Sequence, residues 1–157
     1  MKSSLIRFTL ILTLFLSVGS LTAMAEDPFM KLTERNDVES TYISKEMLSF
    51  VNPNLMRVGR LNLSNQMGNI TSIIIINSEK SSGVEACRKT MESFISSNRN
   101  VVTLMRDKDE TDITTIYAIT DEKKPSAYSA IMLYETSKDG NSEECQIVLL
   151  RGALTIP

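Results

Sequence analysis

The side chains that usually carry catalysis near neutral pH are missing from this 157-residue chain, which contains no histidine. An imidazole moves the proton in Ser-His-Asp and Cys-His mechanisms, and it is a frequent ligand of zinc and haem iron. The chain also lacks a serine three residues before a lysine, the GxSxG turn of serine hydrolases and the glycine-rich loops that hold nucleotide phosphates. The sequence therefore predicts a protein without enzyme activity and without a cofactor.

Carboxylates are the remaining candidates for acid–base chemistry, because a glycosidase needs two of them across a cleft. Five candidates fall in or beside expected turns: Asp121, Glu122, Glu135, Glu143 and Glu144. They follow no recognisable spacing, and the chain has no tryptophan that would form a sugar-binding platform. A carboxylate-based hydrolase is accordingly a remote alternative, and solvated surface charge is the favoured interpretation.

The chain has two cysteines, Cys87 and Cys145. In an oxidising compartment an even number of cysteines favours a disulfide, whereas two buried thiols would serve as small apolar side chains. The sequence does not supply the Cα separation that a disulfide requires, so both interpretations stay open. Two thiols without a histidine do not make a zinc site, and we expect no bound metal.

The first 25 residues have the pattern of a secretory signal peptide, with Lys2 and Arg7 before an apolar stretch at 8–18. The segment ends in Ala23-Met24-Ala25, which predicts cleavage between Ala25 and Glu26. As a helix, the apolar stretch would reach only about 16 Å, against about 30 Å for the hydrocarbon core of a membrane. We therefore expect a periplasmic or secreted protein whose mature chain, 26–157, has no transmembrane span.

The mature chain is mildly acidic. Two of the 17 basic residues belong to the leader, so 15 basic and 19 acidic side chains remain, a net charge of −4. Binding to nucleic acid depends on clustered lysines and arginines, so the charge argues against a nucleic-acid partner. The 132 residues that remain after 25 are removed from 157 suit a single globular domain.

Hydrophobic periodicity predicts most of the secondary structure. Strands are expected at 38–43, 71–76, 101–106, 113–120, 127–135 and 145–151, and the isoleucine run in the second of these indicates burial on both faces. Helices are expected at 83–97, where Val84, Cys87 and Met91 share the apolar face, and over shorter stretches at 26–35 and 45–51. One helix over 37–51 is an alternative, but its β-branched residues favour a strand followed by a helix.

Local signals refine this assignment. Ser82 and Glu85 have the spacing of a capping box at the start of the helix at 83–97. Short links at 107–112, 121–125 and 137–141 favour antiparallel neighbours among the last four strands. The element order predicts an α+β domain, with a mainly antiparallel sheet of four to five strands and helices packed on one face.

Several short segments together resemble a known family. The stretch Tyr42-Ile43-Ser44-Lys45-Glu46-Met47-Leu48 is similar to the N-terminal signature of the family called domain of unknown function 4252. Further segments follow in the order of that family, at 78–80, 88–89, 104–109, 117–118 and 147–152, although 51–61 has no counterpart. The resemblance covers residues 29–156. It implies an exported protein of Gram-negative bacteria, and it implies no activity and no functional residues.

Three hypotheses about function follow. The favoured one is a non-enzymatic exported binding or accessory domain of the bacterial envelope, whose partner is another envelope protein. The alternative is a small-ligand-binding protein with a pocket between the helix at 83–97 and the sheet, near Thr115 and Tyr117. The carboxylate-based hydrolase is the remote third.

Overall fold

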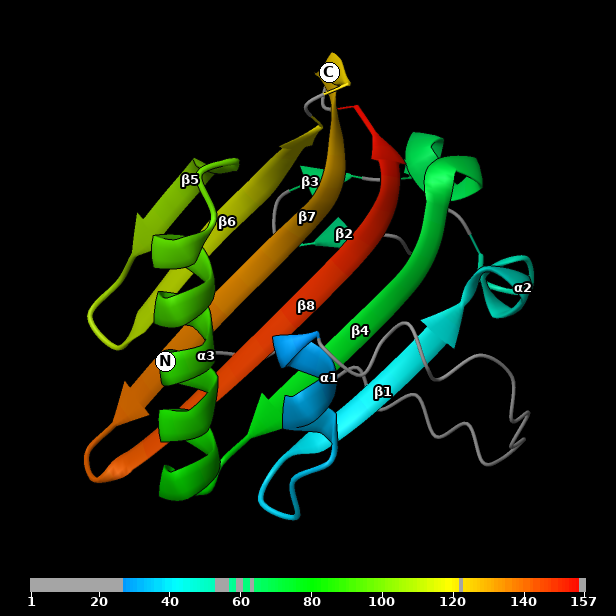
Figure 1. Ribbon diagram of the computed structural model, residues 1–157. Helices are drawn as coiled ribbons and strands as arrows, with labels where there is room; N and C mark the ends of the chain where they lie inside the picture. The colour runs from blue at the N-terminus through cyan, green and yellow to red at the C-terminus, as the bar shows by residue number, and fades with distance from the viewer. Residues whose placement is uncertain (1–26, 53–56, 59–60, 63, 122, 156–157) are drawn as a thin grey trace.

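Strands make up most of the regular structure in the computed structural model of the protein (Figure 1), which describes residues 27–52, 57–58, 61–62, 64–121 and 123–155. The helices are α1 (Pro28–Thr33), α2 (Lys45–Leu48) and α3 (Ser81–Ser97), with a 3₁₀ helix η2 (Ser64–Asn69). The strands are β1 (Glu39–Ser44), β2 (Arg57–Val58), β3 (Leu61–Asn62), β4 (Ile70–Ser78), β5 (Val101–Lys108), β6 (Asp112–Asp121), β7 (Lys124–Asp139) and β8 (Ser142–Leu154).

Six of these strands form one antiparallel sheet in the order β1-β4-β8-β7-β6-β5, and β2 pairs separately with β3. The expected meander of the last four strands is confirmed, but the expected count of four to five strands is wrong. The sheet has six because β4 pairs with β8 on one side and with β1 on the other. The early and late parts of the chain therefore share one hydrogen-bonded ladder.

The isoleucine run of β4 explains the position of this strand inside the sheet. Ile74 and Ile76 belong to the apolar cluster on one face, whereas Ile73 and Ile75 belong to the cluster on the other. Apolar side chains on both faces of a strand are removed from water only when both faces of the sheet are covered. Such a strand is therefore favoured in the interior of a sheet, with a partner on each edge. β4 meets these conditions, as the sequence predicted.

Helices α1 and α3 cover the first face of the sheet, in front of it in Figure 1. Phe29 of α1 and Met91 of α3 are fully buried there, and the Phe29 ring contacts Phe94 edge-on at a centroid distance of 5.1 Å. The predicted helix at 83–97 and its buried stripe are confirmed, including the burial of Cys87. The strands contribute to the same core through β4, β7 and β8.

The second face has a core of its own, so the helices do not all lie on one face as expected. Leu48 of α2 is buried among side chains of this face, such as Ile73 and Leu150. α2 has four residues, fewer than the stretch predicted at 45–51. It follows β1 directly and lies on the side of the sheet opposite α1 and α3, because Leu48 is the residue that finds apolar contacts there.

The start of α3 differs from the predicted capping box. The helix begins two residues earlier, at Ser81, with Lys80 at the N-cap position and without a side-chain capping hydrogen bond. The Ser82 hydroxyl donates instead to Asp37, and Glu85 accepts a hydrogen bond from Arg88. Ser82 thus contacts a residue of the α1–β1 loop and does not cap its own helix. The spacing of Ser82 and Glu85 could not predict this contact, because Asp37 is distant in the sequence.

The hairpin between β7 and β8 is tighter than predicted. Residues expected in the link at 137–141 are paired in the ladder, out to Asp139 opposite Ser142. The remaining turn contains Gly140, whose φ of 61° lies in the left-handed region that favours glycine. None of the helices in the described ranges is long and apolar enough to cross a membrane.

Candidate functional site

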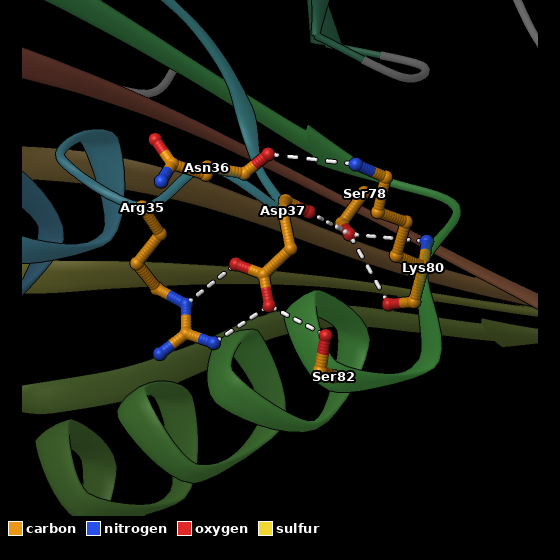
Figure 2. A network of polar contacts seen from close by, with 6 residues as sticks. All are labelled: Arg35, Asn36, Asp37, Ser78, Lys80 and Ser82. Carbon is orange, nitrogen blue, oxygen red and sulfur yellow. Dashed lines mark hydrogen bonds and ion pairs between the residues drawn. The ribbon is translucent and has the colours of Figure 1, made fainter.

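A network of polar contacts joins the α1–β1 loop to the turn between β4 and α3, and Figure 2 shows it. We call it the Asp37 network; its residues are Arg35, Asn36, Asp37, Ser78, Lys80 and Ser82. The loop brings Asp37 to the start of α3, although 45 positions separate Asp37 from Ser82 in the sequence. Two segments that are distant in the chain are thus fastened at one end of the sheet.

The Asp37 carboxylate is the centre of this network. Arg35 donates to both of its oxygens, from Nε at 2.8 Å and from Nη2 at 2.7 Å, and the Ser82 hydroxyl donates to Oδ2 at 2.6 Å. Such two-pronged contacts with a guanidinium are stronger than single neutral hydrogen bonds. The hydrogen bonds from Arg35 and Ser82 hold the pKa of the Asp37 carboxyl well below its usual range.

Ser78 links the backbones of the two segments. Its buried hydroxyl donates to the main-chain oxygen of Asp37 at 2.7 Å and accepts from the main-chain N–H of Lys80 at 3.3 Å. Lys80 Nζ donates to the main-chain oxygen of Asn36 at 3.5 Å. These contacts satisfy backbone groups at the end of β4 that would otherwise lose water without a replacement partner.

Gly83 allows the two segments to approach this closely. A Cβ atom at this position would lie 2.2 Å from Ser78 Oγ and 2.3 Å from the main-chain oxygen of Asp37. Glycine inside a helix costs about 1 kcal/mol relative to alanine. The close contact with the loop accounts for a residue that is otherwise unfavourable in α3.

The contacts of the Asp37 network suit a structural role, in which the α1–β1 loop is held against the start of α3. A nucleophilic serine needs a base that takes its proton near neutral pH, and a carboxylate with a lowered pKa is a weak base. Beside the network lies a shallow, open depression of about 460 Å³, lined by Glu34, Arg35, Asn36, Asp37 and Lys80. Arg35 and Asp37 form an ion pair with each other. Neither charge of this pair is therefore left to attract a ligand into the depression.

The structure brings Glu135 and Glu144 to diagonal positions of the β7–β8 ladder and places Asp121 and Glu143 elsewhere. Glu135 lies in β7 on the second face, where burial and the neighbouring Asp112 carboxylate raise the pKa of its carboxyl. Glu143 is bonded to Arg88 of α3 on the first face, and Asp121 accepts from the main-chain N–H of Lys123 at 2.9 Å.

The two candidates that remain are Glu144, which is partly buried in β8 opposite Ser137, and Glu122, which lies outside the described residues. The four described candidates therefore do not gather at one site. Within the described ranges, no group of three or more cysteine and carboxylate side chains is placed to hold a metal ion.

Cys87 and Cys145 do come together. The first lies on the buried face of α3 and the second in β8, and both belong to the apolar cluster of the first face, where each thiol shifts the pKa of the other. This contact lowers the pKa of the Cys87 thiol and, together with burial, raises the pKa of the Cys145 thiol. Both thiols are free in the structure.

The residues expected near a pocket between α3 and the sheet lie on the first face of β6. Thr115 is buried opposite Tyr134, and the partly buried Tyr117 packs against the core of this face. The described depression is located elsewhere, at the Asp37 network. The predicted cleavage site at Ala25 and Glu26 lies outside the described residues.

An exposed apolar surface lies beside β1. Tyr42 is 50% exposed, and Met47 and Phe50, which follow in and after α2, are 40% and 84% exposed. We call these three side chains, with the outer edge of β1, the β1 surface. Among the described strands, β1 pairs with β4 alone and ends the sheet on this side (Figure 1).

Sequence reasoning missed the Asp37 network and the β1 surface. The Arg35-x-Asp37 spacing was the one local signal for the first, since it lets a guanidinium and a carboxylate meet across a turn. The partners Ser78 and Ser82 come from more than 40 positions away and leave no such signal. The exposure of Tyr42 depends on which strand ends the sheet, and periodicity does not give strand order.

The fold and its polar fastening define an α+β protein, built on a six-stranded antiparallel sheet with α1 and α3 on one face. The sequence model of the family described as domain of unknown function (DUF4252) matches residues 29–156, and the chain belongs to this family. No curated protein and no solved structure shows significant similarity to the chain. The family expected from the order of the segments is thus confirmed.

Proposed function

We propose that this protein is an exported, non-enzymatic domain of the bacterial envelope that binds another protein by adding a strand to the edge of β1. The leader with Lys2, Arg7, the apolar stretch at 8–18 and Ala23-Met24-Ala25 supports export. The observation that carries the binding mode is that no other described strand pairs with the outer edge of β1. An open edge offers a row of main-chain donors and acceptors to an incoming strand.

The two edges of the sheet differ in how they are protected. β5 carries Arg106, Asp107 and Lys108, and a bulge at Leu104 shifts its register. Charged side chains and bulges are the usual devices that prevent unwanted pairing at an edge. β1 pairs with β4 over six residues without a register shift, and Glu39 at its start is its one charged residue.

The side chains around β1 suit a protein partner. Tyr42 in the strand is half exposed, and Met47 and Phe50, which follow β1 in the chain, are exposed as well. Aromatic and methionine side chains are enriched at the centres of protein interfaces, where they bury a large area. A large apolar side chain as exposed as Phe50 gains free energy when a partner covers it.

The charges at the two ends of the edge indicate what the partner strand carries. Glu39 lies at the start of β1 and Lys45 directly follows its end, with uncharged residues between them. The matching strand from another envelope protein has a basic residue opposite Glu39, an acidic residue opposite Lys45, and uncharged residues between.

Two matched variants test this proposal. Thr41 in β1 and Thr103 in β5 are both exposed threonines on edge strands, and each is replaced by lysine. Tagged wild-type and variant proteins are cross-linked in native envelope, and captured proteins are quantified by mass spectrometry. We expect Thr41→Lys to lower the yield of one reproducible partner by about tenfold or more, because a charge blocks pairing at an edge. Thr103→Lys retains the yield.

A photoreactive residue locates the contact. It is placed at Phe50 or, as a control, at Lys89 on the exposed side of α3. The partner is expected to cross-link from position 50 and not from position 89. Equal cross-linking from both positions, or equal capture with both lysine variants, contradicts binding through β1. A product made of two copies of this chain contradicts a partner of different sequence.

A further inference from the structure

Packing of α3 on the sheet brings Cys87 against Cys145. The two residues are 0% and 4% exposed and belong to the same apolar core cluster, where each thiol shifts the pKa of the other. They stand 58 positions apart (145 minus 87) and belong to different elements, α3 and β8. The helix and the strand therefore present their cysteines to the same place in the core.

A second contact holds the same two elements in this register. Arg88, which follows Cys87, donates to Glu143, which lies two residues before Cys145 in β8. Arg88 also pairs with Glu85 on its own helix at 2.7 Å. The ion pairs lie near the surface, where each contributes little to stability, but the Arg88–Glu143 pair joins α3 to β8 close to the two cysteines.

We propose that Cys87 and Cys145 form an intramolecular disulfide in the exported protein, which fastens α3 covalently to β8. The proposal rests on export, one part of the proposed function, and is independent of binding at the β1 edge. An envelope compartment is oxidising, so a pair of adjacent thiols there is expected to be oxidised. Closing a loop of this length restricts the unfolded chain and so favours the folded state.

The oxidant is a disulfide, carried by a protein or by a small thiol, and the reaction takes two exchange steps. One cysteine thiolate attacks a sulfur of the oxidant, which breaks the oxidant's S–S bond, forms a mixed disulfide and releases a thiolate. The second cysteine thiolate attacks the sulfur of the first, forms the Cys87–Cys145 bond and releases the other thiol of the oxidant. Two thiols of the protein lose two protons and two electrons, and the oxidant gains them.

Because both sulfurs are buried in the folded protein, the disulfide must form before folding is complete. Exchange requires a line of attack on sulfur, which the packed core denies to an external thiol. The bond therefore forms before α3 closes over β8, and in the folded protein it resists reduction. We expect a thiol reductant to open it much faster in urea than in native buffer.

The state of the thiols is measured in the full-length protein expressed in its native cells. Envelope and cytoplasmic fractions are quenched with acid, denatured and treated with N-ethylmaleimide, and intact masses are recorded with and without prior reduction. We expect envelope protein that takes up the label at both cysteines only after reduction. Peptide mapping without reduction is expected to join the peptide of Cys87 to that of Cys145.

Each other outcome overturns the proposal in a distinguishable way. Labelling of both cysteines without reduction, in protein recovered from the envelope, overturns the disulfide alone. Protein that stays in the cytoplasm with both thiols free overturns export and the disulfide together. A bond between two chains overturns the intramolecular pairing.

Stability provides a second readout. Reduction in urea followed by refolding is expected to lower the Tm of the wild-type protein by roughly 10 °C. The double variant Cys87→Ala/Cys145→Ala, which keeps an apolar core, is the control and is expected to show the same Tm with and without reductant. A wild-type Tm that does not respond to this treatment contradicts the proposal.

Discussion

At the scale of single residues, Asp37 connects three separate segments of the chain. Its carboxylate accepts from Arg35 and Ser82, and its main-chain oxygen accepts from Ser78. One residue of the α1–β1 loop thus contacts the end of β4 and the first turn of α3. A change at Asp37 or at its partners is felt by all three elements.

The lowered pKa of Asp37 predicts a pH dependence of stability. Its folded-state pKa lies below that of a free carboxyl, about 4, so its contribution is present above about pH 4 and is lost as the pH falls toward the folded-state value. We predict that the free energy of unfolding, measured with urea, falls less steeply between about pH 5 and about pH 2 in Asp37→Asn than in the wild type. Asp139→Asn, which removes an exposed carboxylate at the end of β7, is the control. Identical slopes in wild type and Asp37→Asn contradict this prediction.

Gly83→Ala is expected to destabilise the protein although alanine is the better helix former. The new Cβ would overlap Ser78 Oγ and the main-chain oxygen of Asp37, and overpacking of this kind costs about 1–3 kcal/mol. This outweighs a gain of about 1 kcal/mol in helix propensity. Chemical denaturation measures the change. Gly68→Ala is the matched control, because nothing lies within 4 Å of a Cβ at that position. Equal stability of Gly83→Ala and wild type means that the loop is not held as described.

At the scale of elements, β4 is the strand on which both cores depend. Its alternate side chains enter the clusters on opposite faces, and it joins β1 to the strands of the later meander. α3 depends in turn on the end of β4, through Ser78 and the turn at Lys80. Weakening β4 is therefore expected to affect more of the molecule than weakening either edge strand.

Truncations in β4 measure this dependence. Ile74 is fully buried, and we predict that Ile74→Ala lowers the free energy of unfolding by about 2–5 kcal/mol, because the lost burial adds to the cost of a cavity. The neighbouring Ile75 is partly exposed, so Ile75→Ala is expected to cost less. Urea denaturation of both variants gives the comparison. An equal loss at the two positions argues against different burial of the two faces.

At the scale of the whole molecule, the order of strands divides the sheet into a protected middle and two edges. β4, β8, β7 and β6 have partners on both sides, whereas β1 and β5 have one partner each among the described strands. Both edge strands have exposed apolar side chains nearby, including Val102 and Leu104 in β5, but the β5 edge is also charged and bulged, whereas the β1 edge is regular. This asymmetry makes one end of the sheet available for contact with another protein.

Hydrogen exchange measured by mass spectrometry is expected to reveal the same division. Amides in the middle of a sheet exchange through global unfolding, whereas those near an edge open locally at lower cost. We predict the slowest exchange in β8 and β4 and faster exchange in β1 and β5. Protection in β5 equal to that in β8 contradicts this order of strands.

The local pattern of the sequence determined where most elements lie and which side chains they bury. Isoleucines in succession indicated a strand covered on both faces, and the stripe of Val84, Cys87 and Met91 indicated a helix with Cys87 in the core. Short links indicated antiparallel neighbours. These signals are readable because side chains repeat every two residues along a strand and about every 3.6 along a helix.

The tertiary structure alone decided which elements meet. Nothing local says that β1 pairs with β4 and β4 with β8, and so the predicted number of strands in the sheet was too low. In the same way, Ser82 found Asp37 across 45 positions instead of capping its own helix, and Cys87 met Cys145 across 58. Such contacts depend on the strand order and on the packing of helix on sheet, which arise from the whole chain burying its apolar surface together.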